Sequence, residues 1–412
     1  MVPFLERCRE RYGETFTLRI LRAGRLVLIS DPPSIKRLFA ADRDNRLPEG
    51  RIFILEPILG RHSVLLLEGE EHLRVRRLML PPFHGERMRA YEETIAAATE
   101  REIASWPLGE TFALHPRMQA ITLEVILGAV FGVEDARRRD ELRELLVTIL
   151  ERTRSGRAQF VGLATRWMGP LGPWRRFSAV LERTDAILLE QIAERRRAPD
   201  LAERQDILSM LCAARFEDGE PMGDREIRDQ LMTLLLAGHE TTATALAWAI
   251  DLLFHNPEPA ARLRESVGAG RGDYLDAVGQ ETLRLRSVVP QVGRQIAEAG
   301  TYGGHELAAG TVVMPAIYLV HTRPDVYREP SEFRPERFLD GGPETFSWIP
   351  FGGGTRRCLG ATFASFEMRV VLRTLTERAE LRPASEAPER IVRRNVTLAP
   401  RGGVPARLVS RA

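Results

Sequence analysis

Apolar residues recur every three or four positions over most of this chain, which is the spacing of a helix with one buried face. The spacing predicts helices over residues 86–105, 121–131, 140–153, 177–198 and 225–255. The last of these patterns is unbroken up to Asn256 and Pro257, and such a helix would be about 45 Å long. A helix of that length crosses a whole domain, so we expect it to lie in the core.

Strand-like patterns are confined to a few short segments. Residues 15–20 and 25–30 predict a hairpin around Gly24, and Asp31 and Pro32 then supply the N-cap and first residue of a helix. Strand patterns return near residues 288–296, 302–314 and the C-terminus, and no internal repeat or low-complexity linker marks a boundary. We therefore predict one mainly α domain over residues 1–412, with a smaller β region formed mainly by residues 14–32, 288–315 and 380–412.

Composition narrows the possible partners. The 412 residues are 44% hydrophobic, which is enough for a large core, and 59 basic residues nearly balance 57 acidic ones. Such a balance gives no strong field that would attract nucleic acid or an anionic membrane. No apolar run approaches the roughly 18 residues that span a bilayer, and the first residues lack a signal-peptide core. We expect a cytoplasmic protein without a membrane anchor that binds no nucleic acid.

Cys358 has the most informative surroundings of any residue in the chain. It lies in a glycine-rich loop over residues 351–360, and an apolar helical pattern begins at Leu359. Glycines allow positive φ and a close approach of the backbone to a flat ligand, and a helix N-terminus favours a thiolate. Cys8 and Cys212 are too distant in sequence to form a zinc or disulfide spacing with Cys358. A thiolate that ligates iron is one interpretation, and an inert cysteine before a buried helix is the other.

Five residues of this loop carry a family resemblance. Phe351, Gly354, Arg356, Cys358 and Gly360 match the haem-binding signature of the cytochrome P450 family, and the resemblance covers essentially the whole chain. It implies that family's fold, with about a dozen helices around a buried haem b. It also implies Cys358 as the iron ligand, Phe351 near the sulfur and Arg356 on a haem propionate. A thiolate ligand favours cleavage of an oxygen–oxygen bond.

The centre of the predicted long helix breaks its apolar pattern. A helix-interior glycine costs about 1 kcal/mol relative to alanine, and a buried carboxylate costs more unless it is paired. A polar stripe that faces another helix is the structural alternative. The segment resembles the family's oxygen-binding motif, which implies that Ala237 and Gly238 leave a groove over the iron, that Glu240 relays protons and that Thr241 hydrogen-bonds to the activated oxygen. We expect His239 to be a packing or hydrogen-bonding residue.

Charged residues elsewhere fit the same resemblance. Glu281 and Arg284 share a helix face, and the resemblance makes them a buried structural triad with Arg337.

His72 and Arg76 also share a face, and the resemblance implies that both of them, like Arg294, contact the haem propionates. For each of these three residues an ordinary surface charge is the alternative. The remaining basic residues near these motifs are expected to face outward, where they would dock an acidic electron donor, and they are Arg74, Arg77 and Arg357.

Apolar segments point to the substrate. Residues 52–55, 64–67, 288–292 and 396–398 favour a hydrophobic small molecule, and Trp167, Met168 and Trp174 lie where the family has a mobile lid. Nothing in the sequence selects among fatty acids, terpenoids, macrolides and aromatic compounds.

The predicted function is that of a haem-thiolate monooxygenase that uses O2 and external electrons to hydroxylate or epoxidise a hydrophobic molecule. The chain ends soon after the helix that follows Cys358, so a separate ferredoxin or flavodoxin with its reductase is the expected donor. Two alternatives stay open. One is a peroxide-driven haem-thiolate enzyme, which typically lacks the acid–threonine pair, and the other is a non-catalytic haem-binding sensor or carrier.

Overall fold

The computed structural model describes residues 2–20, 24–47, 51–83, 85, 87–154, 173–394 and 396–411. The chain forms two compact units, each built from separate stretches of sequence. The first comprises Met1–Pro48, Thr99–Gln119 and Thr241–Ala412, and the second comprises Glu49–Ala98 and Ala120–Glu240. Because the stretches alternate along the chain, no single sequence boundary divides it, which agrees with the absence of a linker.

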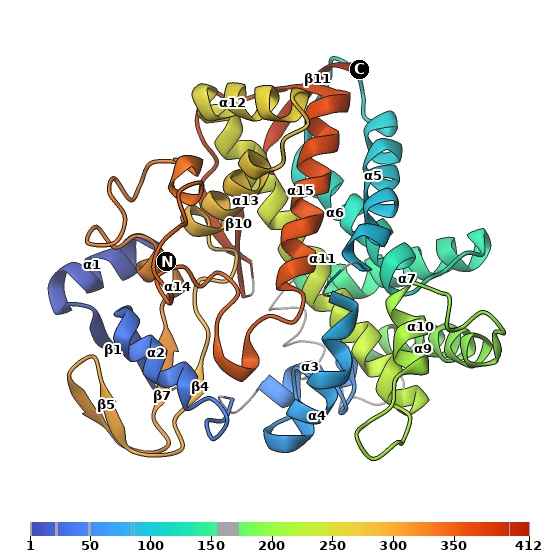
Figure 1. Cartoon of the computed structure of the whole chain (residues 1–412), viewed down its shortest axis with the longest axis horizontal. Helices are drawn as coiled ribbons and strands as arrows, with labels where there is room; N and C mark the ends of the chain where they lie inside the picture. Colours follow the sequence, from blue (N-terminus) through green and yellow to red (C-terminus); the bar gives the residue numbers. More distant parts are fainter. Residues whose placement is uncertain are drawn as a thin grey trace. The chain divides into compact units, whose positions relative to one another are not determined.

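Helices make up most of the described chain (Figure 1). They are α1 (Val2–Tyr12), α2 (Pro32–Ala40), α3 (Arg51–Leu59), α4 (Gly69–Met79), α5 (Arg87–Ser105), α6 (Leu114–Val125), α7 (Ala136–Arg154), α9 (Pro173–Arg197), α10 (Ile207–Ala213), α11 (Asp224–His255), α12 (Pro257–Gly268), α13 (Asp273–Leu285), α14 (Ile317–His321) and α15 (Ala361–Arg378). A π-helical turn, Ile126–Val130, continues α6. No helix in these described ranges is long and apolar enough to cross a membrane.

The strands of the first unit form small sheets. They are β1 (Thr15–Ile20), β2 (Gly24–Ile29), β3 (Thr111–Ala113), β4 (Arg294–Gln295), β5 (Gly300–Tyr302), β6 (His305–Leu307), β7 (Val312–Pro315), β8 (Ala379–Pro383), β9 (Ile391–Arg394), β10 (Thr397–Pro400) and β11 (Pro405–Arg411). The largest sheet has the order β1-β2-β7-β4, with β1 and β2 antiparallel and β2 and β7 parallel. The hairpin predicted around Gly24 is confirmed.

Helix α2 packs beside this sheet, as Figure 1 shows. Its N-cap is Asp31, whose carboxylate accepts a 2.8 Å hydrogen bond from the Ser34 amide, and Pro32 is its first residue, both as predicted. The apolar face of α2, including Leu38 and Phe39, joins a buried cluster with residues of β2 and β7. This packing fixes where the chain emerges from the C-terminal end of α2.

Several predicted boundaries were wrong, each for a local reason. The strand predicted over residues 288–296 is reduced to β4, because Pro290 has no amide hydrogen to donate to a ladder. The run over residues 302–314 is divided twice. Gly303 and Gly304 turn the chain between β5 and β6 with φ of 56° and 78°, and Gly310, with a φ of 81°, lies between β6 and β7. The helix expected from Leu359 begins at Ala361 instead, with Gly360 as its N-cap.

The predicted long helix is confirmed as α11, which has 32 residues. Between Ile227 and Leu252 most of its side chains are buried, including Trp248, whose indole N–H donates a 2.9 Å hydrogen bond to the carbonyl of Leu398. A helix that is apolar around most of its circumference is stable only inside a core, so the position inferred from its length is supported.

Candidate active site

The loop around Cys358 is closed by backbone hydrogen bonds. The amide of Gly352 donates to the carbonyl of Ile349 at 2.9 Å, and the amide of Cys358 donates to the carbonyl of Phe351 at 2.9 Å. The Phe351 ring packs edge-on against Trp348, with 6.2 Å between the ring centroids. The loop therefore has a defined shape that presents Cys358 three residues before the start of α15, at the N-terminal end of the helix dipole.

The three cysteines differ in exposure. Cys358 is exposed, whereas Cys8 and Cys212 are buried. Burial raises the pKa of the Cys212 thiol to about 11, so that thiol stays protonated and unreactive at neutral pH. Cys358 is thus the cysteine placed to bind a metal-containing ligand.

The consecutive glycines serve the protein's own packing more than we expected. A Cβ at Gly353 would overlap the ring of Phe39, and a Cβ at Gly354, which has a φ of 67°, would overlap the carboxylate of Asp42. Among the described residues, a Cβ at Gly360 would meet nothing within 4 Å, and a Cβ at Gly352 would meet only the Val292 side chain, at 4.0 Å. Gly353 and Gly354 therefore let the loop pack against the end of α2, whereas Gly352 and Gly360 keep the predicted role of leaving room for a ligand.

A buried ion pair lies directly against this loop. Nε of Arg294 donates to Oδ1 of Asp42, and its Nη2 donates to Oδ2 of Asp42 at 3.2 Å and to the carbonyl of Gly353 at 3.3 Å. Nη1 donates to the carbonyl of Gly293 at 3.0 Å. A guanidinium has five N–H donors, so one hydrogen on Nη1 is left over among these contacts. A buried arginine with one unused N–H donor agrees with the prediction that Arg294 binds a haem propionate.

The predicted structural triad is confirmed. Glu281 and Arg284 form a bidentate pair at 2.6 and 2.8 Å with both side chains fully buried, and Arg337 donates to Glu281 at 3.3 Å. The other N–H groups of Arg284 donate to the carbonyls of His321, Pro330 and Glu332 at 2.8, 2.8 and 3.0 Å. All five donors of Arg284 are therefore satisfied, which makes this arginine a structural residue.

His321 is an important residue that the sequence reasoning missed. It is fully buried at the end of α14, its Nε2 accepts a 2.8 Å hydrogen bond from the Ile349 amide, and its Nδ1 lies 3.0 Å from the Ser287 hydroxyl. Burial, and then the nearby Arg284 guanidinium, lower the pKa of His321 to about 3. A neutral histidine therefore holds the start of the Cys358 loop. Its only sequence signal was a histidine at the end of the apolar run Ile317–Val320.

On α11, exposure is concentrated on one face near the predicted oxygen-binding motif. Ala237 is exposed, and Leu234, Gly238 and Thr241 are half-buried, in a helix whose neighbouring residues are mostly buried. Positions spaced by three and four residues lie on the same face of a helix. Glu240 is also half-buried, whereas Thr242 is buried. The accessible hydroxyl of the motif is therefore that of Thr241.

His239 has the packing role that we expected. It is buried, its Nδ1 lies 2.9 Å from the Thr122 hydroxyl, and that hydroxyl donates to the His239 carbonyl at 3.2 Å. The histidine side chain ties α11 to α6 and is not available as an iron ligand.

Helix α4 carries the remaining predicted residues. His72 is buried and Arg76 is half-buried one turn later on the same face. Arg74 and Arg77 are exposed, as expected, but each forms an ion pair, with Asp218 at 2.6 Å and with Glu217 at 2.9 Å. These two arginines already have acidic partners. Among the three arginines predicted to dock an electron donor, the exposed Arg357 is therefore the one that best supports the prediction.

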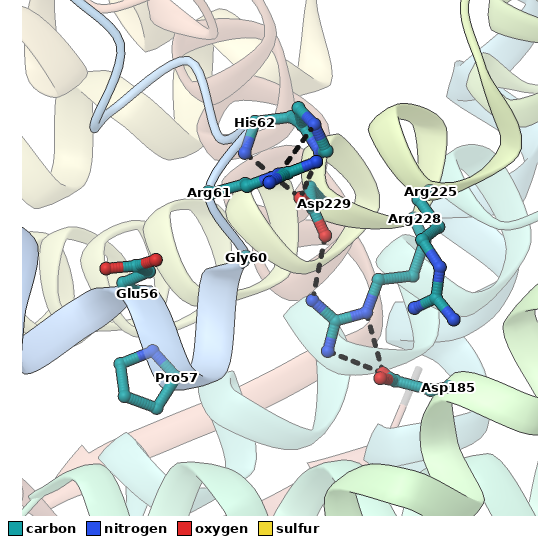
Figure 2. A pocket seen from close by; sticks show the side chains of 9 residues that line it. All are labelled: Glu56, Pro57, Gly60, Arg61, His62, Asp185, Arg225, Arg228 and Asp229. Atoms are coloured by element: carbon teal, nitrogen blue, oxygen red, sulfur yellow. Dashed lines mark hydrogen bonds and ion pairs between the residues drawn. The ribbon is translucent and has the colours of Figure 1, made fainter.

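The loop that follows α3 is held against α11 by hydrogen bonds. Asp229 accepts hydrogen bonds from the amide of His62 at 3.1 Å and from its ring Nδ1 at 3.0 Å, and Arg228 links Asp229 to Asp185 (Figure 2). These residues line a pocket of about 490 Å³ in the second unit. A Cβ at Gly60 would overlap Asp229, so this glycine, with a φ of 82°, is needed for the contact.

These hydrogen bonds position part of the predicted substrate region, residues 64–67. Three further hydrogen bonds join the loop to α11. The Val64 amide donates to the Gln230 side chain at 3.0 Å, the Gln230 side-chain amide donates to the His62 carbonyl at 2.5 Å, and the Ser63 and Thr233 hydroxyls lie 2.7 Å apart. Val64 is buried, whereas Leu65 is 37% exposed. Trp167 and Met168, predicted to belong to a lid, lie outside the described residues.

The residues present fit a haem. An exposed thiol stands on a shaped loop, a buried guanidinium beside that loop has one spare donor, and α11 offers an accessible small-residue face with a hydroxyl and a carboxylate. A thiolate, a carboxylate-binding arginine and an acid–alcohol pair are the donor set for thiolate-ligated haem.

Comparisons with known proteins agree with this fit. The family model for cytochrome P450 matches residues 1–404. A Mycobacterium tuberculosis protein named cytochrome P450 135B1 is 42% identical over 411 residues, covering 98% of this chain and 86% of that protein. Another protein from that organism, named cytochrome P450 137, is 40% identical over 400 residues, covering 96% of this chain and 83% of its own length.

Solved structures confirm the fold. A retinoic acid-bound cyanobacterial CYP120A1 superposes with a TM-score of 0.82 at 23% identity, covering 99% of this chain and 94% of that chain. The haem domain of cytochrome P450DA gives a TM-score of 0.85 at 21% identity, covering 100% of this chain and 93% of that chain. The predicted architecture, mainly helical with a smaller β region, is confirmed.

Proposed function

Because this chain belongs to the cytochrome P450 family and is therefore a haem-thiolate monooxygenase with haem b as cofactor, we propose that it hydroxylates or epoxidises a hydrophobic small molecule. The observation that carries the proposal is the exposed thiol of Cys358 on its hydrogen-bonded loop. When bound, the haem activates dioxygen and inserts one of its atoms into the substrate, while the other atom leaves as water.

The loop and its surroundings hold the cofactor in this proposal. Cys358 ligates the iron as a thiolate, Phe351 packs near the sulfur, and Gly354 and Gly360 shape the loop. Four basic side chains bind the two propionates, and they are His72, Arg76, Arg294 and Arg356. The support is strongest for Arg294, which is buried beside the loop and retains one N–H donor.

Residues of α11 supply the protons. Releasing one oxygen atom as water consumes two electrons and two protons per turnover, and the protons must reach the reacting oxygen. The half-buried Glu240 takes up a proton from solvent and passes it to the hydroxyl of Thr241, which donates toward the reacting oxygen. Ala237 and Gly238 keep that face of the helix small enough to admit the oxygen and the substrate.

The substrate site is formed by apolar residues. Leu65 and Val396, which are 37% and 61% exposed, are large apolar side chains within segments that the sequence assigned to substrate binding. A site lined mainly by apolar side chains favours an apolar ligand. The two electrons come from a separate ferredoxin or flavodoxin with its reductase, and the enzyme works in the cytoplasm.

Two other functions use the same haem site. A peroxide-driven enzyme and a non-catalytic sensor or carrier both lack a need for proton delivery. The accessible carboxylate and hydroxyl of Glu240 and Thr241 favour the monooxygenase over both.

The test is the absorption spectrum of the reduced protein with carbon monoxide. We expect the strongly red-shifted Soret band of thiolate-ligated haem in the natural protein and in the control Cys8→Ala. Cys358→Ala should lose that band. A haem-free protein, or a band that persists without Cys358, would contradict the assignment of the ligand and of the function together.

A further inference from the structure

Asp42 lies at the meeting point of α2, β4 and the Cys358 loop, and no motif pointed to it. Its side chain is fully buried, and it accepts hydrogen bonds from the Arg294 guanidinium, from the Thr355 hydroxyl at 3.1 Å and from the Arg356 amide at 3.1 Å. We propose that Asp42 is a positioning residue that fixes the Cys358 loop and, by neutralising Arg294, holds down the reduction potential of the haem.

Asp42 contacts both a side chain and the backbone of the loop. One of its carboxylate oxygens receives both the Thr355 hydroxyl and the Arg356 amide, and Arg356 is two residues before Cys358. The absence of a Cβ at Gly354 is what lets the loop approach this carboxylate. A charge-assisted hydrogen bond to a backbone amide is about twice as strong as a neutral one. The carboxylate therefore restrains the part of the loop from which the cysteine projects.

The electrostatic part of the proposal follows from the donors of Arg294. Asp42 takes two of its five N–H groups, the carbonyls of Gly293 and Gly353 take two more, and one remains for a haem propionate. The guanidinium therefore binds the propionate as half of a neutral ion pair. Arg284, whose carboxylate partner Glu281 and carbonyl partners use all five donors, has no such spare group.

The sign of the effect is set by the charge change on reduction. Reduction of the ferric haem adds one negative charge, and a nearby positive charge without a counter-ion stabilises the reduced form. Both members of the pair are almost fully buried, with exposed fractions of 0% for the Asp42 side chain and 5% for the Arg294 side chain, so solvent screens them little. The ion pair with Asp42 therefore largely cancels the field of Arg294 at the haem.

The inference rests on the proposed haem-thiolate function, and the experiment separates the two. Midpoint potentials of the substrate-free holoenzyme are measured by spectroelectrochemical titration for Asp42→Asn, Arg294→Gln and the double variant. Asp42→Asn leaves Arg294 uncompensated and should shift the potential in the positive direction. The double variant restores neutrality, so its potential should return toward that of the natural protein.

Two controls identify a purely structural effect. Thr355→Ala removes the hydroxyl that donates to the carboxylate and carbonyl of Asp42 without changing any charge. Asp31→Ala removes the N-cap of α2 without touching the loop. Neither should move the potential. A carbon monoxide band of the thiolate type in every variant shows that ligation is intact.

The outcomes are distinct. If the natural protein lacks the thiolate-type band, the proposed function fails. If the band is present but Asp42→Asn leaves the potential unchanged or lowers it, the inference about Asp42 is overturned. If Asp42→Asn does not retain haem, the Arg294→Gln variant tests the inference by itself. That variant leaves the Asp42 carboxylate without a counter-ion, which should lower the reduction potential. A rise of the potential would overturn the inference.

Discussion

At the scale of single residues, the site depends on buried arginines whose N–H donors are paired with carboxylates and carbonyls. Glu281 pairs with the fully buried Arg284 and with the partly exposed Arg337, and Asp42 joins Arg294 to the Cys358 loop. Replacing one member of such a set leaves the remaining charges buried without a counter-ion. The cost of the replacement is therefore much greater than the net stability that the intact pair contributes.

The first prediction concerns Glu281. Glu281→Ala should lower the free energy of unfolding by about 3–5 kcal/mol, because it strands a fully buried guanidinium. The measurement is urea unfolding followed by circular dichroism. Glu258→Ala, which removes an exposed partner of Arg262, is the matched control and should leave the unfolding curve nearly unchanged. Equal effects of the two substitutions would contradict the structural role of the triad.

Residues of the site could be predicted from the sequence where they belong to a motif of fixed spacing. Glu281, Arg284 and Cys358 were found because they belong to short patterns with a recognisable spacing. Asp42 and Arg294 are separated by 252 residues, and His321 reaches an amide 28 residues further on. No periodicity or local propensity relates such positions, so only the folded chain brings them together. Arg294 was found through the family resemblance, but its partner was not.

At the scale of elements, the long helix α11 combines packing and chemistry. Its length and buried character followed from the apolar pattern, and the break in that pattern marked the face that is now seen to be accessible. The short strand β4 and the division of residues 302–314 were not predicted correctly. Strands of a few residues depend on their neighbours in the sheet more than on their own sequence.

The second prediction separates the two threonines of α11. Thr241→Ala should reduce the yield of product per O2 consumed by at least about tenfold, because it removes the hydroxyl that we propose as the proton donor to the reacting oxygen. Thr242→Ala, at a buried position, should keep that yield and lose only some stability. The yield is measured from oxygen uptake, product and hydrogen peroxide once a substrate is found. Loss of yield in Thr242→Ala alone would reverse the assignment.

At the scale of the whole molecule, two buried groups titrate abnormally and shape the response to pH. His321 has its pKa lowered to about 3, and burial raises the pKa of the fully buried Glu367 carboxyl on α15 to about 8. Both groups are therefore neutral in the folded protein at pH 7. In the unfolded chain they regain ordinary pKa values of 6.5 and 4.5.

The third prediction is a plateau of stability between about pH 4.5 and pH 6.5. Below pH 6.5 unfolded His321 binds a proton that the folded residue does not, so stability falls with falling pH, by about 1.4 kcal/mol per pH unit. Above pH 4.5 unfolded Glu367 loses a proton that the folded carboxyl keeps up to about pH 8, so stability falls with rising pH. Between these values the two slopes cancel.

Urea unfolding from pH 4 to pH 9 checks this plateau. Glu367→Gln should flatten the decline above pH 6.5 and turn the plateau into a rise of stability with pH, because the His321 slope is then uncancelled. His321→Gln should flatten the decline below pH 4.5 and turn the plateau into a fall of stability with rising pH. A Glu367→Gln variant with the same alkaline decline as the natural protein would show that the carboxyl is not held neutral.

Because the three cysteines differ in exposure, the reactivity of the protein's thiols can be used to measure the fraction of protein that contains haem. Cys8 and Cys212 are buried, and the Cys212 thiol stays protonated, whereas Cys358 is exposed. In the haem-free protein a thiol reagent such as dithionitrobenzoate should react rapidly with about one equivalent of thiol, since only the exposed thiol is accessible. Added haem should suppress that equivalent in proportion to the fraction bound. A colorimetric titration would then measure haem uptake without reference to the haem spectrum.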